Sequence, residues 1–468
     1  MAGGLMQLVA YGAQDVYLTG NPKVTFFQAV YKRHTNFAME LIQQTTNGSP
    51  SSSGRVSVTI ARNGDLVGNM HVALTPASNV LTSNNNVFDT NWVAERAIAA
   101  VELTIGGQRI DKHYQTWWRL YAEVFLNESD KYAWGKMTTM SNPIAQGSAG
   151  TVTAALSPSK VYLPLLFFFN RNPGLYLPLI ALQYHEVRLD FDLTAYYASY
   201  FGTTNAFEVW ANYVYLDTEE RRRFAQKGHE YLIEQVQHTG GDQLASNGTE
   251  GSVQLVRLSF NHPVKELVWC YTNPNASATA NLNSMWNFCT ATGNVNVTSN
   301  VLALQASNNY IVPNLTGVPH LVSTAGTQSN IFGLPGTANF AGNAYWVEQG
   351  TQFLGGVGPG VEVGPLHLFK VILNGQDRFK EQLGNYFNQV QPFYHHTGTP
   401  YPGIYVYSFA LQPEEHQPTG TCNFSRIDNA QVSVQMKSNN QATLQKLFAV
   451  NYNILRIQSG MGGLAFSN

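Results

Sequence analysis

Charged residues are scarce in this chain. Asp, Glu, Lys and Arg make up 12% of its 468 residues, against about 25% in an ordinary soluble protein. Asn, Gln, Ser, Thr and Gly take their place, although a monomer of this size normally needs more surface charge to stay dispersed. We interpret the shortage as surface hidden in permanent contacts with other copies of the chain. A monomer with an uncharged polar surface is the alternative.

The net charge of −2 is also close to zero, so the composition predicts no broad basic surface for nucleic acid. The one basic run, Arg221–Arg223, directly follows Glu219 and Glu220. We interpret it as a self-neutralised surface turn rather than a phosphate site, and we expect no direct contact with nucleic acid.

Cysteines and long apolar runs are few as well. The three cysteines are Cys270, Cys289 and Cys422. Their odd number and spacing fit no metal or redox motif and favour folding in a reducing compartment without disulfides. The first charge is Asp15, so no secretory signal is predicted. The longest apolar run, Val161–Phe169, contains Pro164 and falls short of the roughly 20 residues that span a bilayer.

Motifs of catalysis and ligand binding are missing too. The glycine-rich Gly355–Gly360 lacks the Lys-Ser/Thr ending of a phosphate loop, and Pro359 spoils a dinucleotide fingerprint. His395–His396 and Glu414–His416 could together ligate a metal, but their spacing defines no site, and we interpret them as polar turn residues. We expect no catalytic residue, no cofactor, no metal and no enzymatic activity.

What the chain does contain is strand pattern. Short stretches rich in Val, Thr, Tyr and Phe alternate with clusters of Gly, Asn and Pro, as in Val56–Ile60, Val187–Phe191 and Ile404–Tyr407. Alternation with period two and frequent turn signals predicts antiparallel sandwiches.

The chain also repeats itself. Leu103–Gln108 returns as Val371–Gln376, and a helical pattern follows each copy. The expected helical faces carry Tyr114, Trp117, Trp118, Tyr121 and Phe125 in the first copy and Phe379, Leu383, Phe387 and Val390 in the second. Weaker matches join Ala211–Leu216 to Val450–Leu455 and Asp65–Val67 to Glu266–Val268. The repeats predict two related domains in tandem.

The distances between the matches locate an insertion. Asp65 and Glu266 are 201 positions apart, whereas Leu103 and Val371 are 268 apart, so the second copy carries ~67 extra residues between them. Long ordered loops commonly carry contact surfaces. The predicted parts are an N-terminal arm and hinge at 1–50 (arm Met1–Gln44, hinge Thr46–Gly54), a first domain at 51–225, and a second at 226–468 with its low-charge insertion at about 271–366. Glycosylation candidates in the insertion are Asn275, Asn296 and Asn314.

Several long strings of the chain resemble one family, in the same order. They are Gly3–Asp15, Thr25–Phe27, Tyr31–Phe37, Leu373–Phe379, Tyr407–Leu411, Pro413–Pro418 and Cys422–Asp428. Together they are similar to the major capsid proteins of nucleocytoplasmic large DNA viruses, as in phycodnaviruses, iridoviruses and mimiviruses. The resemblance runs from the N-terminal arm to Gly462–Leu464, and the insertion is the main departure from it.

The resemblance implies an all-β fold of two tandem eight-stranded antiparallel jelly rolls, with short helices and long loop insertions. It also implies a homotrimeric, pseudo-hexameric capsomer that tiles an icosahedral shell in the virion after synthesis in the host cytoplasm. The implied partners are neighbouring capsomers, penton and minor capsid proteins, the internal viral membrane near the arm, and the host surface at the outer loops. Two alternatives stay open: a jelly-roll carbohydrate-binding protein or glycosidase, and a minor paralogous capsid protein.

Overall fold

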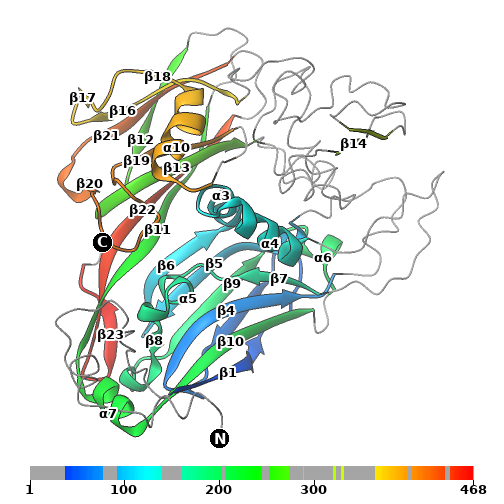
Figure 1. The fold of residues 1–468 in the computed structure, drawn as a ribbon, viewed down its shortest axis with the longest axis vertical. Helices are drawn as coiled ribbons and strands as arrows, with labels where there is room; N and C mark the ends of the chain where they lie inside the picture. The colour runs from blue at the N-terminus through cyan, green and yellow to red at the C-terminus, as the bar shows by residue number, and fades with distance from the viewer. Residues whose placement is uncertain are drawn as a thin grey trace, which may run out of the picture.

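In the computed structural model the alternating pattern becomes antiparallel sheet. The described residues are 37–76, 92–139, 160–202, 206–244, 252–272, 288, 320–322, 328–330, 364–398, 400, 403–437 and 443–466. They form two β-sandwiches (Figure 1), the first in blue to green and the second in green and yellow to red.

The first sandwich has the strand order of a jelly roll. One sheet runs β1-β10-β4-β7, with β8 beside β4, and the other runs β2-β3-β9-β5-β6. The strands are β1 (Phe37–Gln44), β2 (Thr46–Asn47), β3 (Arg55–Thr59), β4 (Leu66–Leu74), β5 (Ile98–Ile105), β6 (Gln108–Tyr114), β7 (Val161–Pro164), β8 (Leu177–Pro178), β9 (Val187–Leu193) and β10 (Phe207–Leu216). Without the two-residue strands β2 and β8, the first, eighth, third and sixth strands form one sheet. The second, seventh, fourth and fifth form the other, which is the double Greek key of an eight-stranded jelly roll.

The second sandwich repeats this order. Its sheets run β11-β22-β13-β19 and β12-β21-β16-β17, with β20, β23 and β18 paired at their sides. The strands are β11 (His229–Gln243), β12 (Val253–Leu258), β13 (Pro263–Thr272), β16 (Leu366–Leu373), β17 (Gln376–Asp377), β18 (Gln382–Leu383), β19 (Ile404–Ser408), β20 (Cys422–Asn423), β21 (Ala430–Met436), β22 (Leu444–Gln458) and β23 (Met461–Leu464). A further pair, β14 (His320–Val322) and β15 (Gln328–Asn330), lies between β13 and β16 in the chain. The predicted fold of two tandem jelly rolls is confirmed.

The strongest sequence repeat corresponds to one hairpin in both jelly rolls. Gly106 and Gly107 turn β5 into β6 with φ of 57° and 83°, and Asn374 and Gly375 turn β16 into β17 with φ of 50° and 79°. Positive φ at both central residues defines the type I′ turn, which Gly and Asn adopt at least cost.

The weaker repeats lie in corresponding strands but not at corresponding positions. Val67 pairs with Tyr213 across β4 and β10. The matched residue Val268 pairs with Phe448 across β13 and β22, four positions before Tyr452, the counterpart of Tyr213. Bulges interrupt both strand pairs and shift their registers independently.

The helices also differ between the copies. The first copy forms α3 (Gln115–Val124) and α4 (Glu128–Thr138) between β6 and β7. The second forms a π-helical turn, η6 (Tyr386–Val390), and then α10 (Gln391–His395). The predicted helical face was therefore wrong for Phe379, which precedes the helix, and for Leu383, which lies in β18. Phe387 is buried as expected.

The N-terminal prediction also needs correction. Phe37–Gln44 is not an arm but strand β1, paired along its length with β10. Thr46–Gly54 is not a hinge, because Thr46 pairs with Val58 and the segment forms a hairpin between β2 and β3. Residues 1–36, most of the insertion and the glycosylation candidates Asn275, Asn296 and Asn314 lie outside the described residues.

The link between the jelly rolls is the exposed helix α7 (Thr218–Gln226), which lies between β10 and β11. It carries the basic run on a helix rather than in a turn. Arg222 and Arg223 lie 3.7 and 3.9 Å from Glu219 and Glu220, and Arg221 lies 3.0 Å from Asp65. The run is self-neutralised, as expected.

Replacing the glycine at the second position of each turn tests the equivalence of the two hairpins. Gly107→Ala and Gly375→Ala meet no atom within 4 Å, so only the left-handed backbone opposes them. Each variant should cost about 1 kcal/mol and lower the thermal midpoint by roughly 2–4 °C. Gly228→Ala is the control, because its nearest neighbour is 3.7 Å away and its backbone is unstrained. An unchanged melting temperature of either turn variant in calorimetry would contradict the assignment of both hairpins as type I′ turns.

Candidate functional site: the junction between the two jelly rolls

In the sheet β11-β22-β13-β19, the strands β22, β13 and β19 are largely buried on both faces. On its inner face, Leu267 and Trp269 of β13 belong to the core of the second jelly roll. On its outer face, Val268 of β13 and Phe448 and Val450 of β22 belong to a hydrophobic cluster continuous with the first jelly roll. Antiparallel sheets commonly leave one face in contact with water. Here the first jelly roll covers that face, so this sheet holds the two domains together.

Aromatic residues of the first jelly roll cover the outer face. The ring of Phe448 lies 5.5 Å from that of Trp117 on α3 and 6.4 Å from that of Tyr114 at the end of β6. His238 of β11 stacks on Phe448 at 4.3 Å, and burial lowers the pKa of this histidine. Gly398 approaches the backbone that follows α3 so closely that a Cβ there would collide with the carbonyl oxygen of Leu126. Aromatic ring pairs such as Phe448 with Trp117 stabilise a packed junction by more than their buried area alone would.

A buried group of charges crosses the junction. Glu234 of β11 accepts hydrogen bonds from Arg171 at 2.9 Å and from Lys265 of β13 at 2.7 Å. Arg171 follows β7 in the short helix α5 (Phe168–Arg171), so it reaches Glu234 from the first jelly roll. Burial alone would raise the pKa of Glu234, but the two cations hold it below its usual value.

A second buried group lies beside it. The side chain of His396 is fully buried, with Nε2 3.1 Å from Glu266 of β13 and Nδ1 3.2 Å from Glu414. Phe125 of the first jelly roll packs edge-on against the same ring at 5.4 Å. Burial disfavours the imidazolium, but the carboxylates of Glu266 and Glu414 outweigh this effect and raise the pKa of His396 to about 9. This histidine is therefore charged at neutral pH.

Sequence reasoning missed most of these residues. It expected His396 and Glu414 to be polar turn residues, whereas the structure makes them part of a buried ion-pair group. The available signal was Lys265-Glu266 at the start of an apolar run in a chain with few charges. Charged residues in a strand that becomes buried need partners of opposite charge. The partners of Lys265 and Glu266 lie far away in the sequence, so the sequence alone did not reveal them.

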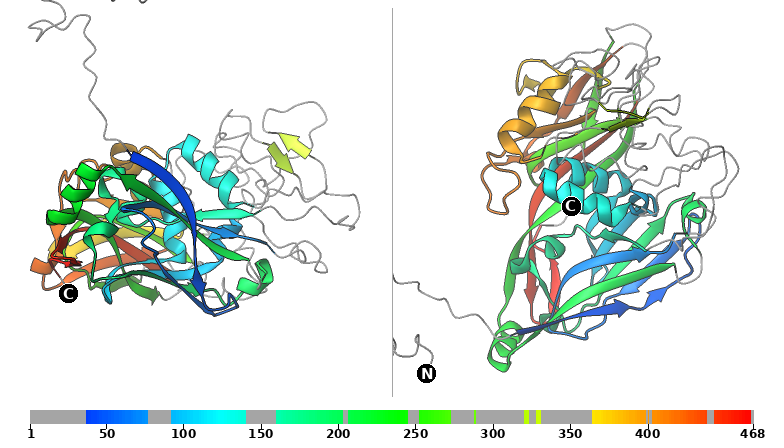
Figure 2. Two further views of the ribbon diagram at one scale, coloured as in Figure 1. Left: turned by 90° about the horizontal axis from the view of Figure 1, so that it is seen from below. Right: turned by 45° about the vertical axis from the view of Figure 1, so that its right-hand side comes forward.

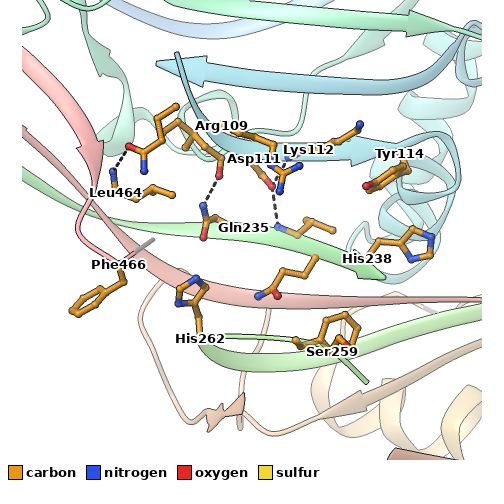
Figure 3. A pocket seen from close by; sticks show the side chains of 15 residues that line it. Arg109, Asp111, Lys112, Tyr114, Gln235, His238, Ser259, His262, Leu464 and Phe466 are labelled. Atoms are coloured by element: carbon orange, nitrogen blue, oxygen red, sulfur yellow. Dashed lines mark hydrogen bonds between the residues drawn. The ribbon is translucent and has the colours of Figure 1, made fainter. Parts of the chain in front are cut away.

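A polar cleft of about 430 Å³ opens at the side of the junction (Figure 3). The carboxylate of Asp111 on β6 accepts a hydrogen bond from the backbone N–H of Val236 on β11 at 3.1 Å. Gln235 donates to the carbonyl of Ile110, and Gln108 accepts from the N–H of Leu464 on β23 at 3.2 Å. These bonds join the two jelly rolls along a polar seam.

The remaining site predictions can be placed. Cys270 and Cys422 are free, and burial raises the pKa of Cys270 to about 12. Within the described ranges, no group of His, Cys, Asp and Glu could hold a metal, and no helix is long and apolar enough to cross a membrane. Cys289 and the glycine-rich Gly355–Gly360 lie outside those ranges.

The His396 group predicts a pH-dependent junction. Since its folded-state pKa of about 9 exceeds the ordinary 6.5, its stabilisation is complete below about pH 6.5 and is lost as the pH rises through about 9. The loss should amount to about 3 kcal/mol. His396→Gln should melt several degrees below the unsubstituted protein at pH 6.5, and this gap should narrow by pH 10.

Calorimetry at several pH values measures the gap. His395→Gln is the matched control, since that neighbouring ring is hydrogen-bonded to the backbone carbonyl of Leu411 rather than to a carboxylate. A gap that stays constant between pH 6.5 and 10 would show that His396 is not charged in the folded protein.

Comparison with known proteins agrees with this architecture. A family model for the large eukaryotic DNA virus major capsid protein matches residues 220–463, and one for the major capsid protein N-terminus matches residues 25–217. The major capsid proteins of Paramecium bursaria Chlorella virus 1 and Phaeocystis pouchetii virus are 42% and 39% identical, each over 100% of both chains.

Solved structures show the same fold. The PBCV-1 virus capsid structure superposes with a TM-score of 0.68 at 38% identity, over 95% of this chain and 100% of that one. The Faustovirus major capsid protein shares the fold at 14% identity, with a TM-score of 0.61 over 97% of this chain and 96% of that one. The chain therefore belongs to the family of large eukaryotic DNA virus major capsid proteins, which are structural proteins of the viral capsid.

Proposed function

We propose that the chain forms a homotrimeric capsomer of pseudo-hexagonal outline that tiles the shell of an icosahedral virion. The observation that supports this most directly is the repetition of one jelly-roll strand order in a single chain, with the two copies joined by a junction buried on both sides. Three such chains around a threefold axis present six similar lobes, and a closed ring leaves no interface unfilled.

The proposed role is mechanical rather than catalytic. The charges of the junction serve as structural ion pairs, because Glu234 and Glu266 each have a cationic partner on another segment. Buried pairs of this kind favour one arrangement of the parts over others. The family relatives are named as capsid proteins, which lends no support to the carbohydrate-binding or glycosidase alternative.

The proposed partners follow from the same role. Neighbouring capsomers in the shell are the principal ones, and the proposed place of assembly is the host cytoplasm. Contacts of residues 1–36 with minor capsid proteins or an internal membrane, and of the 273–363 region with the host surface, remain predictions from the family resemblance.

The native mass of the purified protein tests the capsomer. Light scattering should show a stable species of three times 51.7 kDa, about 155 kDa. The species should persist on dilution to low micromolar concentration, because obligate interfaces bury ~2,000 Å² or more. A monodisperse 51.7 kDa species under these conditions would refute the trimer.

A further inference from the structure

The polar cleft of about 430 Å³ lies where an edge strand of one jelly roll meets an edge strand of the other. Strand β6 ends the order of its sheet beside β5, and β11 ends the order of its sheet beside β22. The loop between β12 and β13 and the C-terminal residues after β23 also line the cleft. Strand β23, in red, lies alongside the first jelly roll (Figures 1 and 2). A cleft of this size can hold a drug-sized ligand or a short stretch of peptide.

Glutamine side chains on the walls of the cleft pair with main-chain groups. Gln237 donates to the carbonyl of Asn261 at 2.7 Å and accepts from the N–H of the same residue at 3.0 Å. Gln108 accepts from the N–H of Leu464 at 3.2 Å. Because an amide side chain offers two N–H donors and an acceptor oxygen, Gln108 and Gln237 can form further hydrogen bonds. Walls of this chemistry suit the backbone of an extended peptide.

Two cations lie on the β6 side of the cleft. Arg109 is exposed and forms no ion pair with any residue that the structure describes. The Nζ of Lys112 lies 3.7 Å from Glu102, which is longer than a hydrogen bond. Only 12% of the residues in this chain are charged. Two cations without a close carboxylate at one cleft therefore indicate an anionic ligand.

The carboxylate that lines the cleft does not neutralise these cations. Asp111 is 5% exposed, and its Oδ1 accepts from the backbone N–H groups of Val236 at 3.1 Å and of Lys112 at 2.9 Å. Its Oδ2 lies 2.9 Å from Nε2 of His113. Since both oxygens are engaged within the chain, the charged ends of Arg109 and Lys112 stay available to a ligand.

The opposite side of the cleft carries an exposed aromatic ring on a fixed backbone. Phe466 is 58% exposed, and its carbonyl accepts a hydrogen bond from Asn453 at 2.9 Å. The backbone N–H of His262 donates to the hydroxyl of Ser425 at 2.8 Å. Figure 3 shows His262 and Phe466 across the cleft from Arg109 on β6. Walls that are held in place before binding lower the cost of ordering a ligand.

We propose that this cleft binds an extended acidic segment of a different protein. Carboxylates of the segment pair with Arg109 and Lys112, its backbone bonds to the glutamine amides, and an apolar side chain packs on Phe466. Charge-assisted hydrogen bonds are the stronger kind, and an arginine can bind a carboxylate through two parallel bonds. The inference goes beyond the proposed capsomer, because the cleft is formed within a single chain.

The acidic residues of this chain do not provide such a segment. Asp190 and Asp192 lie inside the sheet strand β9, and Glu219 and Glu220 lie in the helix α7. Residues 1–36 contain a single acidic residue, Asp15. The occupant of the cleft therefore comes from another protein.

A labelled peptide of ten glutamates tests the cleft, with a peptide of ten glutamines as its uncharged match. Fluorescence anisotropy on the purified full-length protein should show binding of the glutamate peptide only, and added salt should weaken it. The cleft variant carries Arg109→Gln and Lys112→Gln and should bind roughly tenfold more weakly or worse, because both charged contacts are lost. Arg257→Gln is the control, since this arginine is exposed on β12 but does not line the cleft.

Photo-cross-linking locates the bound peptide. A glutamate peptide with a benzophenone at one end, irradiated with the unsubstituted protein, should attach to residues of β6 or to Leu464–Phe466. Mass spectrometry of the digested protein identifies the attachment site. The cleft variant should lose this product, while the Arg257→Gln protein should keep it. Thermal melting of both variants confirms that they are folded.

Two outcomes would overturn the proposal. The first is a glutamate peptide that does not bind, or that binds the cleft variant as tightly as the unsubstituted protein. The second is binding to phosphatidylcholine vesicles that contain phosphatidylserine, lost in the cleft variant and without binding of the peptide, which would assign the cleft to a lipid headgroup. The native mass is measured separately, so a trimer that binds no acidic peptide refutes the cleft proposal and leaves the capsomer standing.

Discussion

The structure depends on one sheet whose inner strands, β22 and β13, are largely buried on both faces. Strand β13 is buried from Val264 to Thr272, because β11-β22-β13-β19 closes the second jelly roll with one face and receives the first jelly roll on the other. A strand buried on both faces must be apolar on both, so β13 reads as a continuous apolar run over Leu267–Tyr271 rather than an alternating one. The two domains cannot separate without exposing Val268, Phe448 and Val450 to water.

Burial on both faces also explains the buried charges. A carboxylate at Glu234 or Glu266 would be costly without a cation, and the structure supplies Arg171, Lys265 and His396. Apolar packing alone tolerates sliding between surfaces, whereas a paired buried charge is satisfied in a single arrangement. In a chain that is only 12% charged, charges placed at the junction therefore orient one jelly roll on the other.

The tandem repeat provides each chain with two sandwiches of one strand order. Inside the chain, the helices of the first jelly roll meet the sheet of the second, and the contact is complete. The helices of the second and the sheet of the first keep exposed aromatic and aliphatic side chains, as Phe393 and Met39 illustrate. A surface with few charges and exposed apolar side chains at two separate places suits a protein of the viral capsid, which is built from many copies.

The sequence alone determined the local and periodic features. Asn374-Gly375 and Gly106-Gly107 specify the hairpins because few residue types adopt positive φ, and period-two alternation specifies antiparallel strands. Long strings in the right order specified the family. Only the tertiary structure decided that Phe37–Gln44 completes a sheet, that Val268 pairs with Phe448, and that the buried ring of His396 lies between Glu266 and Glu414. Apart from the contact of His396 with Glu414, these outcomes depend on bulges, registers and contacts between residues more than a hundred positions apart. Such contacts form only when the sheets pack together.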